Sequence, residues 1–145
     1  MKTILKVLFW LAIFWILMMF WMFMVQSAKA SWAPLKIGGS QRQQDIINYA
    51  WHISQDPNWI ATLEAENGTW EENRIGVTGD KGICQMNPRS WNWFIKSPQF
   101  QDYHYQILMC AAEYSKASKE NRLSTTFYGW NRRESAKRNF VWFNN

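Results

Sequence analysis

The stretch over residues 57–88 limits what this chain can fold into more than any other part of the sequence. It starts with a helical pattern that Asp56-Pro57 would begin and Asn67-Gly68 would end, since proline suits the first helical turn and glycine the residue after the last. Four glycines lie between residues 67 and 88, a density that argues against a continuous helix there. The sequence therefore predicts a short helix over 57–66 that carries Glu66 in its last turn, followed by an irregular loop or a small hairpin.

An apolar run from Val7 to Val25 dominates the first thirty residues and follows two cations, Lys2 and Lys6. It leads to Ala28-Lys29-Ala30, which has the small-x-small form that a signal peptidase reads, so the segment predicts export. The nineteen residues of the run also come close to the roughly 20 that a membrane-spanning helix needs. Cleavage after Ala30 and retention as a membrane anchor both stay open. In either case we expect an extracytoplasmic protein, secreted or anchored facing the cell wall.

The charge of the part beyond residue 30 is small. The whole chain has a formal net charge of +5, but three of its sixteen cations precede Ser31 and none of its eleven acids does. Residues 31–145 therefore carry thirteen cations against eleven acids, a balance that suits contact with an anionic cell wall. The charge alone gives no indication of nucleic-acid binding. We expect a monomer that meets the membrane only through its N-terminal segment.

Only two cysteines occur, Cys84 and Cys110. After export they could form one disulfide, which would help a small core, or they could remain two separate buried thiols. No Cys-His spacing suggests zinc, and we expect neither a metal nor a cofactor. His52 and His104 have no nucleophile near them in the sequence, which makes a Cys-His enzyme built on Cys84 a poor interpretation.

Further helices are indicated by apolar residues at helical spacing and by capping residues. We predict them over residues 45–54, 90–96, 103–118, 124–130 and 135–143. Residues 31–44 contain a proline, a glycine pair and a polar run, and predict a linker. The expected architecture is one mainly α domain over 45–145, with six or seven helices and at most a small β-hairpin, after an N-terminal apolar helix.

Three short motifs follow one another in this domain. They are Glu66-Asn67, then Gly82-Ile83-Cys84-Gln85-Met86, then Tyr128-Gly129-Trp130-Asn131. Their order and spacing resemble the signature of the Slt-type lytic transglycosylases and the goose-type lysozymes: a helix ending in Glu-Ser, a loop with Gly-Leu-Met-Gln, and a Tyr-Asn pair. The third motif is altered here. The resemblance covers about residues 45–131 and implies a lysozyme-like fold.

The resemblance implies that Glu66 is the catalytic residue, because the register of the family's Glu-Ser fits Glu66 and does not fit Glu64. Helical periodicity leans the same way, since it places Glu66 slightly nearer than Glu64 to the apolar side of the helix. A partly buried glutamate among aromatic rings can keep its proton near neutrality, as an acid catalyst requires.

The resemblance also implies a sugar-binding cleft around this carboxyl. The residues that we expect to bind substrate are Asn67, Gln85, Met86, Tyr128 and Asn131, although Gly129 stands where the family has Asn. Trp70 and Trp130 are added because they adjoin the motifs and because indoles suit the C–H faces of pyranose rings. The remaining tryptophans are assigned to packing.

The activity implied is cleavage of the β-1,4 bond between N-acetylmuramic acid and N-acetylglucosamine in peptidoglycan. Glu66 would first protonate the leaving oxygen and then, as a carboxylate, take a proton from the sugar's 6-hydroxyl, which closes a 1,6-anhydro ring. Two alternatives stay open. One is hydrolysis, with Asp80 as a second carboxylate that activates water. The other is a non-catalytic module of the same fold that only binds the wall.

Overall fold

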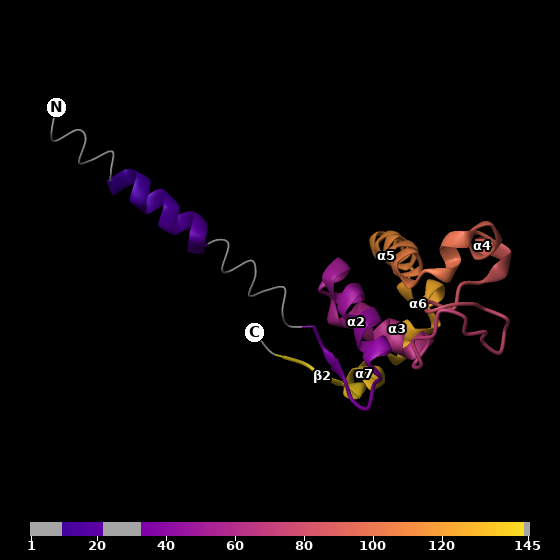
Figure 1. Ribbon diagram of the computed structural model, residues 1–145. Helices are drawn as coiled ribbons and strands as arrows, with labels where there is room; N and C mark the ends of the chain where they lie inside the picture. Colours follow the sequence, from indigo (N-terminus) through magenta and orange to yellow (C-terminus); the bar gives the residue numbers. More distant parts are fainter. Residues whose placement is uncertain (1–9, 22–32, 144–145) are drawn as a thin grey trace. The chain divides into compact units, whose positions relative to one another are not determined.

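The computed structural model describes residues 10–21 and 33–143 (Figure 1). The chain divides into two compact units, Met1–Trp32 and Ala33–Asn145. In the first unit, residues 10–21 form a helix with mostly exposed side chains. Among the described residues, no helix combines the length and apolar character that crossing a bilayer requires. The predicted cleavage site after Ala30 and both ends of the apolar run lie outside the described residues.

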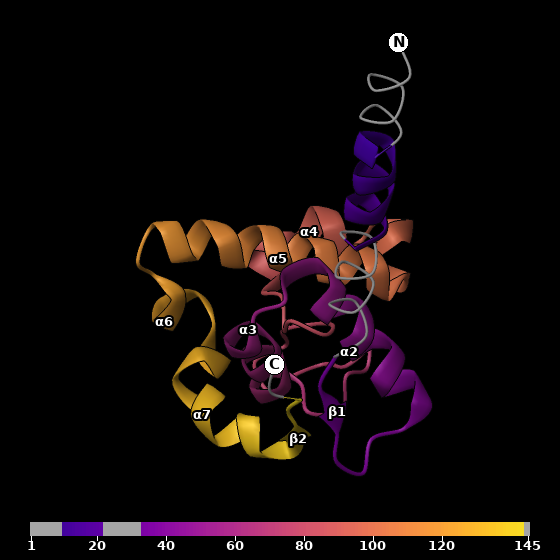
Figure 2. The same ribbon diagram turned by 90° about the vertical axis from the view of Figure 1, so that its left-hand side faces the viewer.

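The second unit is mainly helical, as predicted, with one two-stranded antiparallel sheet among its described residues. Its α-helices are α2 (Gln41–Ser54), α3 (Pro57–Glu66), α4 (Pro88–Ile95), α5 (Tyr103–Lys119), α6 (Leu123–Thr126) and α7 (Arg133–Ala136). The 3-10 helices are η1 (Pro98–Gln101), η2 (Tyr128–Arg132) and η3 (Lys137–Asn139), and the strands are β1 (Leu35–Lys36) and β2 (Phe140–Val141). Figure 2 shows α3 in the middle of this unit, with α5 along one edge, α2 on one side and α6 and α7 on the other.

The central helix α3 has the bounds that the sequence predicts. Asp56 caps it, because its Oδ1 accepts the backbone N–H of Asn58 at 2.8 Å, and Pro57 occupies the first turn. Tyr114 of α5 donates its hydroxyl to the other carboxylate oxygen of Asp56 at 3.1 Å. The N-terminal end of α3 is therefore fixed to α5, and this helps to hold the opposite end, where Glu66 lies.

The predicted linker over 31–44 is wrong for its described part, because residues 33–44 belong to the folded unit. The Ser40 hydroxyl accepts the backbone N–H of Gln43 at 3.2 Å, and the Gln43 side chain accepts the backbone N–H of Ser40 at 2.8 Å. The polar run is thus a capping box that starts α2 at Gln41, four residues before the predicted start at Asp45. The domain begins near residue 33 rather than at 45.

The two strands join the ends of the folded unit. Leu35 pairs with Val141 and Lys36 pairs with Phe140 in an antiparallel register. Within residues 68–88 the structure has an irregular loop with isolated bridges only, so the sheet is not a local hairpin. The pairing connects segments about a hundred residues apart, which local sequence patterns do not indicate.

The last two predicted helices are broken into shorter pieces. The backbone is extended at buried Phe127, which separates α6 from η2 within the predicted helix over 124–130. The predicted helix over 135–143 corresponds to α7 and η3, which end at Asn139, because the next two residues leave to form β2. In both places a tertiary contact overrides a weak helical preference.

The loop over 68–88 is held to α5 by a disulfide and by a buried amide. Cys84 and Cys110 are bonded, with their Cα atoms 6.3 Å apart, so the structure has the disulfide rather than two separate thiols. Gln106 is fully buried, accepts the backbone N–H of Ile83 at 2.9 Å and donates to the Glu72 carbonyl at 3.0 Å. These contacts fix the segment that follows Glu66 against the longest helix of this unit.

Candidate active site

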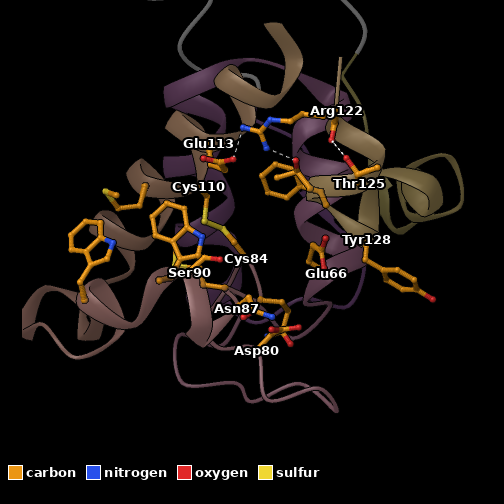
Figure 3. Close-up of a pocket in the computed structure, with 17 residues that line it drawn as sticks. Glu66, Asp80, Cys84, Asn87, Ser90, Cys110, Glu113, Arg122, Thr125 and Tyr128 are labelled. Atoms are coloured by element: carbon orange, nitrogen blue, oxygen red, sulfur yellow. Dashed lines mark hydrogen bonds and ion pairs between the residues drawn. A yellow bond between two sulfur atoms is a disulfide. The ribbon is translucent and has the colours of Figure 1, made fainter. Parts of the chain in front are cut away.

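A cavity of about 810 Å³ opens beside the C-terminal end of α3, and Glu66 forms part of its wall (Figure 3). The rest of the wall comes from the loop over 68–88, from α4 and α5, and from residues 122–128. Figure 3 shows Glu66 and Asp80 toward one end and the ion pair of Glu113 and Arg122 toward the other, with the disulfide between them. This volume lies within the range of about 300–1,000 Å³ typical of sites that bind small molecules.

The Glu66 carboxyl is half-buried, and its Oε1 accepts the backbone N–H of Gly129 at 2.8 Å. Burial raises the pKa of Glu66 above the ordinary value of 4.5, because removal from water disfavours the charged form. The Gly129 N–H lowers this pKa, the negative charge of Asp80 raises it, and the backbone of Tyr128 lowers it again, and the net direction is upward. The group is thus shifted toward holding a proton, while a backbone donor is in place for its carboxylate form.

The structure reverses the predicted order of burial of the two glutamates of α3. Glu64 is only 5% exposed, and its carboxylate accepts from Lys36, from the Trp70 indole N–H and, at 2.8 Å, from Asn139. The periodicity argument fails because α3 is surrounded by other elements and has no single apolar side. Glu64 therefore joins β1 and η3 to α3, and it does not line the cavity.

Two of the predicted substrate-binding residues are part of the core. Asn67 is fully buried, where its amide donates to the carbonyls of Glu71 at 3.0 Å and Gly82 at 3.3 Å and its Oδ1 accepts from Thr69 at 2.8 Å. Trp70 is 1% exposed. Neither side chain lines the cavity, so the assignment of both to substrate binding is wrong for this structure.

Three predicted residues of the loop do line the cavity: Asp80, Gln85 and Met86. Gln85 donates to the Gly82 carbonyl at 2.8 Å, so it also stabilises its own turn. Asp80 accepts from the Thr78 hydroxyl at 2.6 Å through one oxygen. Its other oxygen is shielded from water and has no hydrogen-bond partner among the described residues.

The side chains of the altered third motif contribute less to the cavity wall than predicted. Tyr128 lines the cavity, but this residue is 62% exposed and its ring points away from Glu66 (Figure 3). Trp130 lies outside the cavity wall, with the Arg133 guanidinium 3.8 Å from its ring centroid. Asn131 is exposed and donates to a backbone carbonyl at 3.4 Å, also outside the cavity. The prediction that these last two side chains bind substrate has no support in the geometry.

Gly129, the residue at which the sequence departs from the family pattern, has the closest contact with Glu66 in this motif. A Cβ at position 129 would lie 2.4 Å from the Thr62 carbonyl oxygen and 3.1 Å from the Ala65 Cβ. Glycine therefore lets η2 pack directly on the end of α3 and bring its N–H to the Glu66 carboxyl. The sequence indicated only that an expected Asn was missing, and no local signal revealed this role.

We expect Gly129→Ala to raise the pKa of the Glu66 carboxyl, measured as the midpoint of an NMR titration of its side-chain carboxyl carbon. The added methyl group forces η2 away from α3, which weakens the N–H bond to Glu66 and so raises the pKa of Glu66 further. A carboxylate that loses a hydrogen-bond donor is less stable relative to its protonated form, so the titration midpoint moves to higher pH than in the wild type. Overpacking should also cost about 1–3 kcal/mol of stability.

Gly68→Ala is the matched control, since it adds a methyl group near the same helix end. Its Cβ would make only ordinary contacts, at 3.5 and 3.6 Å, with Glu64. The titration midpoint of Glu66 in this variant should coincide with that of the wild type. If the Gly129→Ala midpoint also coincides with the wild type, the role of the backbone donor is refuted.

Two tryptophans that the sequence assigned to packing, Trp91 and Trp93 of α4, line the cavity, and Trp91 also packs against the core as predicted. Both follow directly after the second motif, which ends at Met86, and this proximity in the sequence was the signal available. The described residues contain no group of three or more side chains suited to hold a metal ion.

Comparisons of this chain with protein-family models, with curated proteins and with solved structures found no match.

Proposed function

We propose that this protein is an exported peptidoglycan lytic transglycosylase that cleaves the β-1,4 bond between N-acetylmuramic acid and N-acetylglucosamine. The observation that carries the proposal is the Glu66 carboxyl, half-buried in the wall of a large cavity with its pKa raised by burial. Gln85 and Met86, which match the second motif, line the same cavity. The order of the motifs is the basis for the proposed family, and the cavity is the place where a glycan strand would bind.

In the proposed reaction the protonated Glu66 donates its proton to the oxygen that links the two sugars. The bond from this oxygen to the anomeric carbon breaks, and the anomeric carbon takes on oxocarbenium character. The 6-hydroxyl of the same sugar then attacks this carbon, and the Glu66 carboxylate accepts the hydroxyl proton. One residue thus serves as acid and then as base, and it returns to its starting form without water.

The environment of Glu66 suits both halves of this cycle. Burial favours the protonated form that begins the reaction, while the Gly129 N–H stabilises the carboxylate present after the first proton transfer. Glu64 cannot act as the acid or the base, because its carboxylate already accepts from three donors and is nearly inaccessible.

A hydrolytic lysozyme is the second candidate, and Asp80 is the observation that favours it. This carboxylate lines the same cavity, and one of its oxygens has no partner among the described residues. In an inverting hydrolase such a group would activate the attacking water.

The variant Asp80→Asn distinguishes the transglycosylase reaction from hydrolysis. For the transglycosylase we expect most activity to remain, with an alkaline limb at lower pH, because removing the negative charge lowers the pKa of Glu66. For the hydrolase, loss of the general base should reduce the rate by about 10²–10⁴-fold. The release of soluble fragments from purified cell wall, measured across pH for both chains, gives the answer.

Mass analysis of the released fragments tests the proposed function itself. The full chain is incubated with purified peptidoglycan, and the soluble products are separated. We expect fragments that end in 1,6-anhydro-N-acetylmuramic acid. Reducing ends would identify the hydrolase, and binding to the insoluble wall without soluble products would identify a non-catalytic module.

A further inference from the structure

Two tryptophan rings lie together on the cavity wall, away from the predicted motifs. Trp91 and Trp93 have ring centroids 6.2 Å apart and planes only 27° from parallel. Both line the cavity that Glu66 lines, yet Trp93 is 65% exposed. Because burial of apolar surface stabilises a fold, leaving an indole this open gives up a substantial stabilisation.

We propose that Trp91 and Trp93, the indole pair, form a saccharide-binding platform that stacks on a pyranose ring of the glycan strand. Pyranose rings present apolar C–H faces, and flat indoles provide large rigid surfaces that cover them at low entropic cost. The platform takes uncharged N-acetylhexosamine units, because its surface is made of neutral rings. This inference rests on the proposed function, since it assigns a second contact for the strand that Glu66 would cleave.

Polar groups for the edge of a sugar are present beside the indole pair. Ser90 and Asn87 line the same cavity, and Figure 3 shows Ser90 on the side away from Glu66 and Tyr128. The Ser90 hydroxyl and the Asn87 side-chain N–H₂ have no hydrogen-bond partner among the residues that the structure describes. An apolar face with a few free polar groups at its edge is the arrangement typical of small-molecule sites.

The platform is held in place by the packing of α4 and by the cap at its first turn. Phe94, the next residue along α4, is buried and lies 5.8 Å from the Trp93 ring. Its other contact is an edge-to-face packing on buried Phe100, at 5.6 Å and 82°. The Asn87 Oδ1 fixes the start of α4 by accepting the backbone N–H of Arg89 at 2.9 Å. A surface that is ordered before binding loses little entropy when a ligand arrives.

Isothermal titration with the β-1,4-linked tetramer of N-acetylglucosamine tests the platform. The full chain carries Glu66→Gln throughout, so that the probe is not turned over. Adding Trp93→Ala should weaken binding about tenfold, which corresponds to about 1.4 kcal/mol. Trp93→Phe, which keeps a smaller flat ring, should recover part of the affinity. Tyr105→Ala is the control, because this tyrosine of α5 is similarly exposed, at 48%, but lies outside the cavity wall.

The outcomes separate this inference from the proposed function. Unchanged tetramer affinity in Trp93→Ala refutes the platform and leaves the proposed function standing. A parent chain that does not bind the tetramer at all refutes the platform, whatever the wall assay gives. If Trp93→Ala loses affinity while the wild type releases no wall fragments, the platform is upheld and the proposed catalytic function is refuted. Thermal unfolding at the same pH must show that each variant is folded.

Discussion

Glu66→Gln is expected to reduce the release of soluble fragments from purified cell wall by at least 10²–10⁴-fold, the usual contribution of a positioned acid or base. The amide keeps the size of the side chain, and its oxygen can still accept the Gly129 N–H. It has no proton to give to the leaving oxygen and cannot take one from the 6-hydroxyl. Full activity in this variant would refute the assignment of Glu66.

The same substitution should not destabilise the protein, which separates loss of chemistry from loss of fold. Burial raises the pKa of Glu66 in the folded state, so the folded chain prefers the protonated form. The stability that this group contributes is fully present below its unfolded pKa and is lost as pH rises through its raised folded pKa. Relative to the wild type, Glu66→Gln should therefore gain thermal stability between acidic and neutral pH.

Glu64→Gln is the matched control, because Glu64 lies two residues earlier in the same helix. Its carboxylate is paired with Lys36 and accepts two further hydrogen bonds. Removing the charge leaves a nearly buried cation without its partner, which typically costs about 3–5 kcal/mol. The two glutamates should thus respond in opposite ways, one losing activity and the other losing stability.

Removing the disulfide is the second large effect that we expect. Cys84 and Cys110 close a loop with a sequence separation of 26 residues, for which loop entropy gives about 3.5 kcal/mol of stabilisation at 25 °C. For a domain of this size the melting temperature should fall by on the order of 10 °C when reductant is added. The activity should fall with it, since the bond holds the segment with Gln85 and Met86 against α5.

Thermal unfolding with and without reductant checks this expectation, together with a thiol count on the oxidised chain. A double Cys84→Ala, Cys110→Ala variant should melt near the reduced wild type and should not respond to reductant. Two reactive thiols in the unfolded, unreduced chain, or a melting temperature that reductant leaves unchanged, would show that the cysteines are not paired.

The helices with strong local signals could be predicted from the sequence. For α3 these signals were Asp56-Pro57 at the start and Asn67-Gly68 at the end, and its bounds are as predicted. The apolar spacing of α5 likewise gave its length to within one residue. The position of Glu66 at the end of α3 follows from these local features.

Contacts between distant segments could not be predicted in this way. The partners of Glu64 include Lys36 and Asn139, which lie 28 and 75 residues away in the sequence. The spacing of residues within α3 contains no information about them, and so the burial of Glu64 was missed. The folded segment around Lys36 was taken for a linker for the same reason, because its strand partner lies near the end of the chain.

The aromatic residues of the cavity were misassigned because closeness in sequence was taken for closeness in space. Trp70 lies four residues after Glu66, but its backbone has φ 56°, an uncommon conformation for a bulky residue, and its indole enters the core. Trp93 lies seven residues after Met86 and was assigned to packing, yet it lines the same cavity as Glu66. Only the path of the loop over 68–88 brings α4 to this place.

An NMR titration of the Glu66 side-chain carboxyl carbon, in the full chain without substrate, measures the property on which the proposed chemistry depends. We predict a midpoint above 4.5, because burial raises the pKa of this group, and a lower midpoint in Asp80→Asn, because a neighbouring negative charge is removed. A midpoint at or below 4.5 would mean that Glu66 gives up its proton as readily as a glutamate in water. That result would contradict its role as the acid that begins the reaction.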